Sequence, residues 1–416
     1  MDVRTYGYPL FIAAVTGFRA LPAEEVRLIV FGAQLAVVLG ACLYVSRRLA
    51  AIFRSDSLGV WAYAAAVLNP VSLIHTTELL SDLLSAVLVQ LALALSWRLA
   101  GPERASRWQP FLSFLCAGAA MAVRPANVAV VAALALVWAF RVIHWKERFL
   151  ASTLSALAGL IPPLVPQMII NYGLARSVSP LIVSSLYREQ RVWGMAALKY
   201  GTVLIPEHSP TLVYVNPLYR GDPGPRAFLR NHTAGYLATL ALHGFGMLDP
   251  DLPFTYVTDL NPWYRWPLCI ANYGLMYLAV LGCAWGAARF LKQRRVDEEG
   301  FVVASSVAVG AAYLLLYLPV EVESRFGLPL LLLMAPLAVV GIRRLVVKQR
   351  AGVAGRALAL AGAVVFVLSC AWLSAWITKQ RTNPVTSSPG NMWVLDPGVA
   401  RARRGIPRAA DDGPNR

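Results

Sequence analysis

Residues 26 to 46 read VRLIVFGAQLAVVLGACLYVS, and two arginines, Arg47 and Arg48, follow directly. Twenty-one residues of α-helix at 1.5 Å each reach about 30 Å, which is the thickness of the hydrocarbon core of a bilayer. The stretch carries only one charged side chain, Arg27, so it is typical of a membrane-spanning helix. Arginines concentrate in cytoplasmic loops, and Arg47 and Arg48 therefore indicate that this helix ends at the cytoplasmic face.

The composition extends this interpretation to the whole chain. Of 416 residues, 57% are hydrophobic and 14% are charged, whereas a soluble domain has roughly 45–50% apolar and about 25% charged residues. The formal charge of +16 comes from arginine clusters between apolar runs, where it sets membrane orientation. We therefore predict an all-α polytopic membrane protein with no nucleic-acid partner.

The remaining apolar runs predict the topology. We expect about ten spans, near residues 26–46, 57–72, 76–97, 108–123, 126–142, 150–170, 268–290, 301–319, 327–342 and 356–377. Basic clusters then occupy every second loop, on the cytoplasmic side: Arg47, Arg48 and Arg54; Arg98, Arg104 and Arg107; Arg141, Lys146 and Arg148; Arg289, Lys292, Arg294 and Arg295; Arg343, Arg344, Lys348 and Arg350. The composition, rich in alanine and arginine and poor in lysine, favours a multi-pass protein of the bacterial cytoplasmic (inner) membrane.

Three further segments lie outside this pattern. Residues 7–18 and 232–248 are apolar but short, and we expect helices that lie in the outer interface. Residues 1–378 form one polytopic domain whose large outer loop covers about 171–267, and residues 379–416 are expected to be a disordered extracytoplasmic tail.

Familiar catalytic motifs are missing from the sequence. It contains no nucleotide-binding, zinc-protease or serine-hydrolase motif, and its five cysteines lie in or beside apolar runs without CxxC spacing. Four isolated histidines (His144, His208, His232 and His243) lack metal-ligand spacing and are expected to be structural. Any chemistry must therefore be built between the membrane helices and their loops.

Ionisable and aromatic groups at the outer ends of apolar runs are the candidates, because burying them unpaired in a membrane is costly. Arg4, Tyr6 and Tyr8 lead into the first interfacial segment. Further on, Glu78 and Asp82 share a helix face at positions i and i+4.

His75 lies about one turn before Glu78, so two acids and an imidazole are expected at one outer rim, although acids also suit a helix N-terminus through its dipole. Arg124 ends an apolar run. Its side chain either binds a phosphate or extends to the membrane–water interface. Glu323 and Arg325 lie in an outer loop, where they bind a ligand or simply pair with each other.

In order and spacing, these stretches resemble the GT-C superfamily of membrane glycosyltransferases, in particular bacterial members related to protein O-mannosyltransferases and to the aminoarabinose transferase of lipid A. The resemblance covers about residues 4–345. It rests on Tyr6-Gly-Tyr-Pro-Leu-Phe11, Arg47-Arg-Leu49, Asn69-Pro70 followed by Glu78, Ala122-Val-Arg-Pro125 and Glu323-Ser-Arg-Phe-Gly-Leu-Pro329.

The resemblance implies transfer of a sugar from a polyprenyl-phosphate carrier to a lipid, glycan or protein hydroxyl outside the cytoplasm. Glu78 then matches the second acid of the family, and Asp82 and Asp2 are further candidates for catalytic acids. Arg124 and Arg325 would neutralise the carrier phosphate, with Glu323 orienting Arg325. No ligand cage for a cofactor is visible in the sequence, and dependence on a divalent cation is left open.

One departure from the family bears on activity. The first transmembrane helix and the leading acid of the first outer loop have no counterpart here, and Asp2 is the only acid before Tyr6. The topology also demands one more preceding helix, so we expect a longer gene product. The alternatives are a non-catalytic cell-envelope assembly subunit of the same fold and, third, a lipid or solute transporter, which would show polar groups at the bilayer midplane and paired broken helices.

Overall fold

The computed structural model describes residues 5–76, 80–97, 108–181, 186–202, 211–222, 224–251, 259, 263–293, 296–320, 322–346 and 353–382. Three of the candidate residues, Asp2, Arg4 and Glu78, lie outside these ranges, as does most of the predicted tail.

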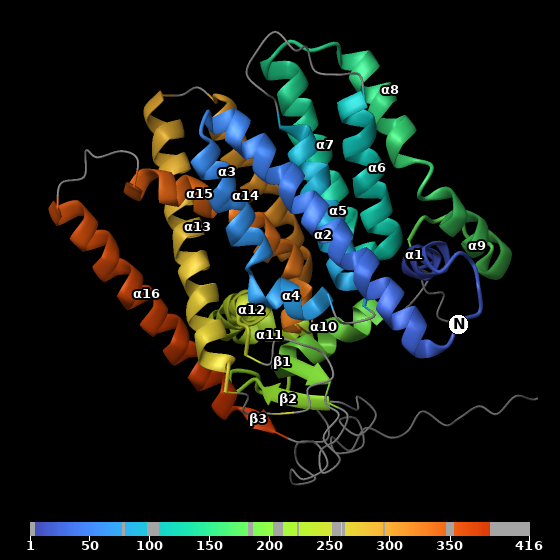
Figure 1. Cartoon of the computed structure of the whole chain (residues 1–416). Helices are drawn as coiled ribbons and strands as arrows, with labels where there is room; N and C mark the ends of the chain where they lie inside the picture. Colours follow the sequence, from blue (N-terminus) through green and yellow to red (C-terminus); the bar gives the residue numbers. More distant parts are fainter. Residues whose placement is uncertain are drawn as a thin grey trace, which may run out of the picture.

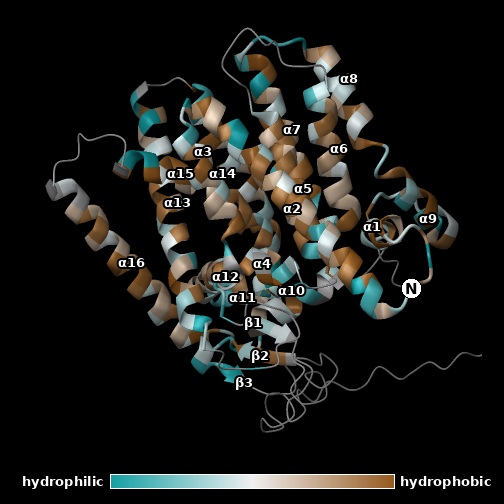
Figure 2. Cartoon of the chain, in the orientation of Figure 1, coloured by the Kyte–Doolittle hydropathy of each residue, from teal (hydrophilic) through white to brown (hydrophobic). Residues whose placement is uncertain are grey.

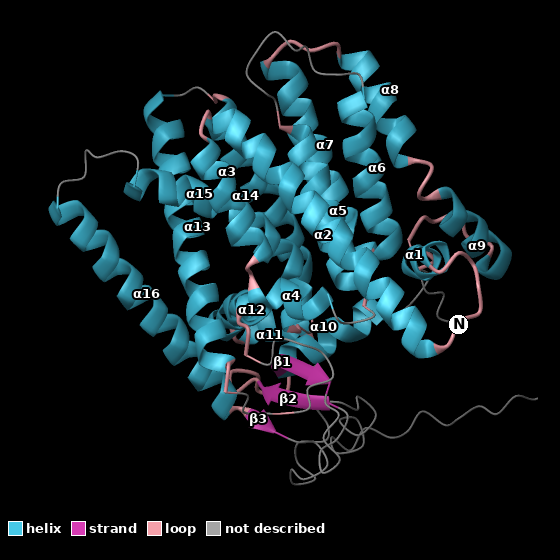
Figure 3. Cartoon of the chain, in the orientation of Figure 1, coloured by secondary structure: helices cyan, strands magenta, loops and turns pink. Residues whose placement is uncertain are grey.

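Helices make up most of the described chain (Figure 3). They are α1 (Gly7–Val15), α2 (Ala23–Phe53), α3 (Asp56–Val67), α4 (Pro70–Thr76), α5 (Ser81–Ser96), α6 (Trp108–Val123), η1 (Pro125–Asn127), α7 (Val128–His144), α8 (Phe149–Leu160), α9 (Val165–Ala175), α10 (Leu186–Ala196), α11 (Pro225–Asn231), α12 (Thr233–Leu248), α13 (Arg265–Gln293), α14 (Glu298–Tyr317), η2 (Ser324–Gly327), α15 (Leu328–Val346) and α16 (Val353–Lys379).

The structure confirms a multi-pass membrane protein. Within the described ranges, six helical segments are long and apolar enough to cross a bilayer, and the pair α8 and α9, bent by 54°, makes a seventh if it counts as one span. A helix lies at each of the ten predicted positions, but α3, α5 and α6 have only 12, 16 and 16 residues. The hydropathy colouring shows apolar residues along the middle of these helices and polar residues toward their ends (Figure 2).

Prolines explain where two predicted spans break. A residue before proline is disfavoured in the helical region, so α3 ends ahead of Asn69 and Pro70 begins α4. The Asn69 side chain caps that new helix by accepting hydrogen bonds from the backbone N–H of Val71 (3.0 Å) and Ser72 (3.3 Å). Pro162 and Pro163 lie at the bend between α8 and α9.

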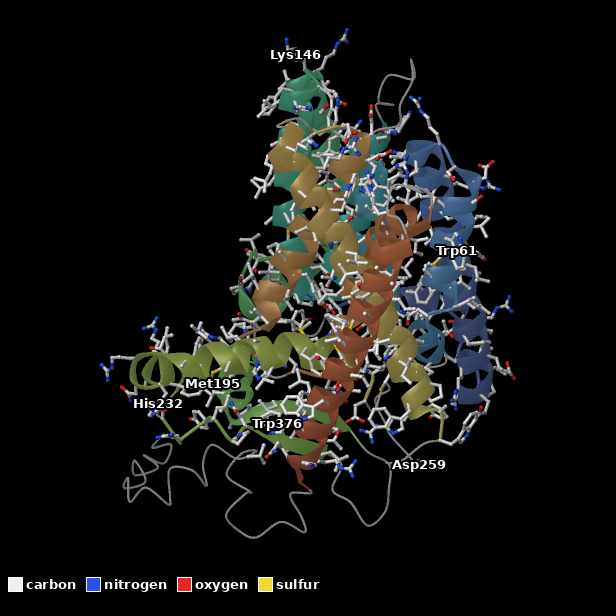
Figure 4. All side chains as sticks on the ribbon, turned by 90° about the vertical axis from the view of Figure 1, so that its left-hand side faces the viewer. Trp61, Lys146, Met195, His232, Asp259 and Trp376 are labelled. Carbon is white, nitrogen blue, oxygen red and sulfur yellow. The ribbon has the colours of Figure 1, made fainter. Side chains whose placement is uncertain are left out.

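The two ends of the bundle differ. Lys146 lies at one end, and His232, Asp259 and Trp376 lie at the other (Figure 4). We call the first the basic end, because Arg289 and Arg343 also lie there, where both pair with Glu299 in the first turn of α14. The second, the sheet end, carries α10, α11, α12 and a small sheet (Figure 1).

The sheet is a departure from an entirely helical expectation. Its antiparallel strands have the order β1 (Ala197–Thr202), β2 (Thr211–Val215) and β3 (Arg381–Thr382). Strand β3 directly follows α16, so the sheet joins residues 197–215 to the last helix. Helix α12 lies across the spans at this end (Figure 4), as expected for an interfacial segment.

Close helix contact in the bundle depends on glycine. A Cβ atom on Gly282 would overlap the carbonyl of Leu337, and one on Gly341 would overlap the carbonyl of Leu278. Helices α13 and α15 therefore touch through their backbones, as small residues allow in membranes.

Candidate functional site

Three chain segments bring charged side chains together near the sheet end. Asp82 lies in the first turn of α5, Arg124 joins α6 to η1, and Glu323 and Arg325 lie in and beside η2. Arg124 precedes Pro125 and is extended, with φ −140° and ψ 115°, so α6 ends at Val123 and the arginine leaves the helix axis.

Arg124 forms an ion pair with Asp82. The Asp82 side chain is 3% exposed and that of Arg124 is 16% exposed. Asn127 fixes the geometry, since its amide donates hydrogen bonds to Ser85 Oγ (2.7 Å) and to the Ala120 carbonyl (2.8 Å). The bend after α6 is thus tied to α5 at the level of the ion pair.

Arg325 forms a second ion pair with Glu323, whose side chains are 21% and 4% exposed. The two arginines meet on one aromatic ring: their guanidinium carbons lie 4.8 Å (Arg124) and 5.3 Å (Arg325) from the ring centroid of Phe326. A guanidinium within about 6 Å of a ring centroid is attracted by the ring quadrupole. Phe326 is therefore the platform that brings the two arginines together.

Two tyrosines of α14 support this platform. The Tyr317 and Phe326 rings lie 5.3 Å apart, and the Tyr313 and Tyr317 rings 4.8 Å apart. The Tyr313 hydroxyl also donates a hydrogen bond to the Phe326 carbonyl (2.9 Å). Tyr313, Tyr317 and Phe326 are all buried in the main core cluster, so α14 holds η2 in place.

We call Asp82, Arg124, Glu323 and Arg325 the charged cluster. Its formal charges cancel, but the carboxylates are buried while the guanidiniums keep some exposure. Each guanidinium has five N–H donors in a rigid fork, more than one carboxylate can occupy. The exposed side of the cluster is therefore suited to an anion such as a phosphate.

Tyr8 and α4 border the cluster. The Tyr8 hydroxyl donates to Gln34 Oε1 (3.3 Å), and the Gln34 amide donates to the Thr76 carbonyl (3.2 Å). Burial raises the pKa of Tyr8, and the nearby Asp82 carboxylate raises it further, so the phenol stays neutral. His75, one residue before Thr76, is buried.

Tyr6 lies elsewhere. Its hydroxyl donates to the Pro163 carbonyl at the α8–α9 bend, and its backbone N–H donates to Gln167 Oε1 (3.3 Å). The next residue, Gly7, allows α1 to approach α6, because a Cβ there would come 2.7 Å from the Ala122 carbonyl carbon. These contacts give Tyr6 an anchoring role for α1.

Sequence reasoning missed a second buried polar network at the sheet end. Lys199 Nζ donates to the carbonyls of Asp249 (3.1 Å) and Asp251 (2.5 Å), and Arg265 pairs with Asp251 at 2.6 Å. The Tyr273 hydroxyl donates to Asp249 (2.7 Å). This network is buried and ties β1 to the end of α12 and to α13. Its sign in the sequence was a set of charged residues within or beside the predicted loop 171–267.

No metal site is evident in the described part of the chain, where no three His, Cys, Asp or Glu side chains come together. His243, expected to be structural, is buried with its ring nitrogens against the carbonyls of Leu318 (2.7 Å) and Ala197 (2.9 Å).

Comparison with known proteins gives no family assignment. No family model matches the chain, and neither a curated protein nor a solved structure matches it. The fold and the site thus define a multi-pass helical membrane protein that carries the charged cluster near its sheet end.

Proposed function

We propose that the protein transfers a sugar from a polyprenyl-phosphate carrier to a hydroxyl of a lipid, glycan or protein at the outer face of the bacterial cytoplasmic membrane. In this proposal the fold is GT-C-like, ten helices cross the bilayer, and the sheet end faces outward. The observation that carries it is the meeting of Arg124 and Arg325 on Phe326. The resemblance of the surrounding sequence motifs supports it.

Sugar transfer needs positive charge where the leaving phosphate develops charge. The acceptor oxygen forms a bond to the anomeric carbon, and the bond from that carbon to the phosphate oxygen breaks with its electron pair on the phosphate. The carrier changes from a phosphodiester to a phosphate monoester and gains negative charge. Two preorganised guanidiniums stabilise this charge more than that of the bound substrate, which lowers the barrier.

The acceptor proton requires a base. Asp82 is already engaged by Arg124, so its role here is to position that arginine. Glu78, between α4 and α5 in the sequence, is the proposed base, and His75 and Tyr8 border the sugar and acceptor. Asp2 and Arg4, which precede α1 in the sequence, are the remaining candidates. Turnover with and without a divalent cation decides whether a metal takes part.

Carrier binding tests the role of the arginines. We would measure binding of undecaprenyl phosphate and of undecaprenol to the full chain in nanodiscs. The wild type should prefer the phosphate. Arg124→Lys and Arg325→Lys keep the charge but lose the fork, and each should weaken phosphate binding about 10-fold, the effect of losing one charge-assisted hydrogen bond.

Arg176→Lys is the matched control, since Arg176 ends α9 and contacts the Tyr172 ring with 5.5 Å between guanidinium carbon and centroid. Equal binding of undecaprenyl phosphate and undecaprenol would contradict the proposal.

The formal charges of the charged cluster cancel, and this favours one alternative, a non-catalytic assembly subunit of the same fold. Phosphate binding without sugar release from any carrier would support that alternative.

A further inference from the structure

Three arginines gather at the basic end, on the last turns of α13 and α15. Arg289 pairs with both Asp297 and Glu299. Arg343 pairs with the other carboxylate oxygen of Glu299. Both acids are therefore already occupied by guanidiniums. The third arginine, Arg344, has no acid paired with it in the described part of the chain.

Arg344 is held against an aromatic ring. Its guanidinium carbon lies 3.5 Å from the ring centroid of Trp285 on α13, and that of Arg289 lies 5.0 Å from the same centroid. Of the three Arg344 nitrogens only Nε is enclosed, and none of the three has an acceptor among the described residues. The side chain is partly exposed, so its terminal N–H groups are free to donate to an external acceptor.

The charges around Arg344 do not cancel. Its charged neighbours are Arg289 and Arg343, which are positive, and Glu299 and Asp297, which are negative. With Arg344 itself, one positive charge is in excess. The sequence extends this surplus, since residues 289–299 and 343–350 together contain eight basic and three acidic residues. A partly buried guanidinium without a paired charge is costly, and a bound anion removes that cost.

The three arginines lie at the level where three spans end. The apolar spans of α13 and α15 end at Lys292 and Leu345, and that of α14 begins at Glu298. This level is the boundary between hydrocarbon and headgroups, whichever side of the membrane the basic end faces. Phe290 and Leu291 in the last turn of α13 are 55% and 75% exposed, so this turn contacts hydrocarbon. The anions held at this depth in a bilayer are the phosphates of its lipids.

We propose that Arg344 binds the phosphate of an anionic phospholipid from the leaflet that surrounds the basic end. The terminal N–H groups of Arg344 donate to the phosphate oxygens, Trp285 holds the guanidinium plane, and the neighbouring arginines add positive potential. A zwitterionic lipid gains less, because the surplus positive charge repels its own cation. This site is distinct from the charged cluster, and the inference depends neither on the proposed sugar transfer nor on the orientation of the chain.

Two photoreactive lipids test the preference. Phosphatidylglycerol and phosphatidylcholine carry the same diazirine at the start of one chain and are compared in nanodiscs that contain the full wild-type chain. Phosphatidylglycerol should label the last turns of α13 and α15 about fivefold more than phosphatidylcholine, as expected for one arginine near the membrane surface. Equal labelling of these turns by both lipids would overturn the proposal, and this comparison needs no variant.

Two variants test the arginine itself. Arg344→Gln removes the charge and should lower phosphatidylglycerol labelling to the level of phosphatidylcholine. Arg344→Lys keeps the charge but loses the planar fork, so it should lower phosphatidylglycerol labelling about threefold, the effect of one hydrogen bond. Arg148→Lys is the matched control, because Arg148 lies two residues from Lys146 at the basic end and is exposed. If Arg344→Lys labels like Arg148→Lys, general attraction to positive charge explains the labelling and the site is wrong.

Inorganic phosphate distinguishes a lipid from a soluble anion. At equal ionic strength, excess phosphate and excess chloride should lower phosphatidylglycerol labelling of these turns to the same extent, because both only screen the charges. A clearly greater loss in phosphate would mean that Arg344 takes a free phosphate, and would overturn the lipid as its ligand.

Discussion

Removing the carboxylate of Asp82 should destabilise the protein far more than removing a comparable carboxylate at the basic end. Asp82→Asn leaves the Arg124 guanidinium largely buried with no paired charge. Breaking a buried ion pair from one side costs about 3–5 kcal/mol, because the remaining charge has lost its compensation. The expected loss in the free energy of unfolding is therefore about 3 kcal/mol or more.

The matched control is Asp297→Asn. Asp297 pairs with Arg289, but the side chains are 37% and 22% exposed, and such pairs contribute at most about 1 kcal/mol. Asn also keeps the cap that Asp297 provides, where its side chain accepts from the Gly300 N–H (2.9 Å). Unfolding by SDS titration in mixed micelles measures both variants on the same scale.

The double variant Asp82→Asn/Arg124→Gln completes the cycle. Since it leaves no buried charge from this pair, it should be less destabilised than the sum of the two single variants. If Asp82→Asn costs no more than Asp297→Asn, or if the double variant equals that sum, the description of a buried, mutually compensating pair is wrong.

Three further variants test other contacts. Phe326→Leu removes the ring shared by both guanidiniums, and undecaprenyl phosphate binding should weaken about threefold or more, since a cation–π contact contributes about 0.5–1 kcal/mol at an exposed site and more when it is desolvated; unchanged binding would exclude Phe326 as the platform. Tyr313→Phe removes the hydrogen bond to the Phe326 carbonyl and should lower the free energy of unfolding by about 1 kcal/mol in the same SDS titration, whereas no loss would mean that this bond does not anchor η2. Gly341→Ala should prevent α13 and α15 from touching and abolish a monodisperse purified fraction in size-exclusion chromatography, while Gly32→Ala, where a Cβ meets nothing within 4 Å, should behave as wild type.

Much of the helical architecture could be predicted from hydropathy alone. The predicted run 108–123 coincides with α6, and the breaks at Asn69–Pro70 and at Pro162 follow from the geometry of the residue before proline. The small sheet could not be predicted, because β3 has two residues and exists only through pairing with β2. Local sequence carries little information about such non-local pairing.

The charged cluster could be predicted only in part. Arg124 was a candidate because it ends an apolar run, and Glu323 and Arg325 were candidates because they lie in a loop before one. The partner of Arg124, however, depends on how α5 packs against α6. Asp82 and Arg124 are 42 residues apart, and no periodicity links them. Phe326 gave no signal as a binding platform, since a phenylalanine beside an apolar run is usually a core residue.

Release of polyprenyl phosphate tests the central claim most directly. The full chain is reconstituted in liposomes with a panel of polyprenyl-phosphate-linked hexoses and pentoses, and free carrier phosphate is measured by mass spectrometry. The account predicts release from at least one donor, retained in Arg176→Lys and reduced about 100-fold or more in Arg124→Lys/Arg325→Lys. Release that is equally fast in the double arginine variant, or no release from any donor, would contradict it.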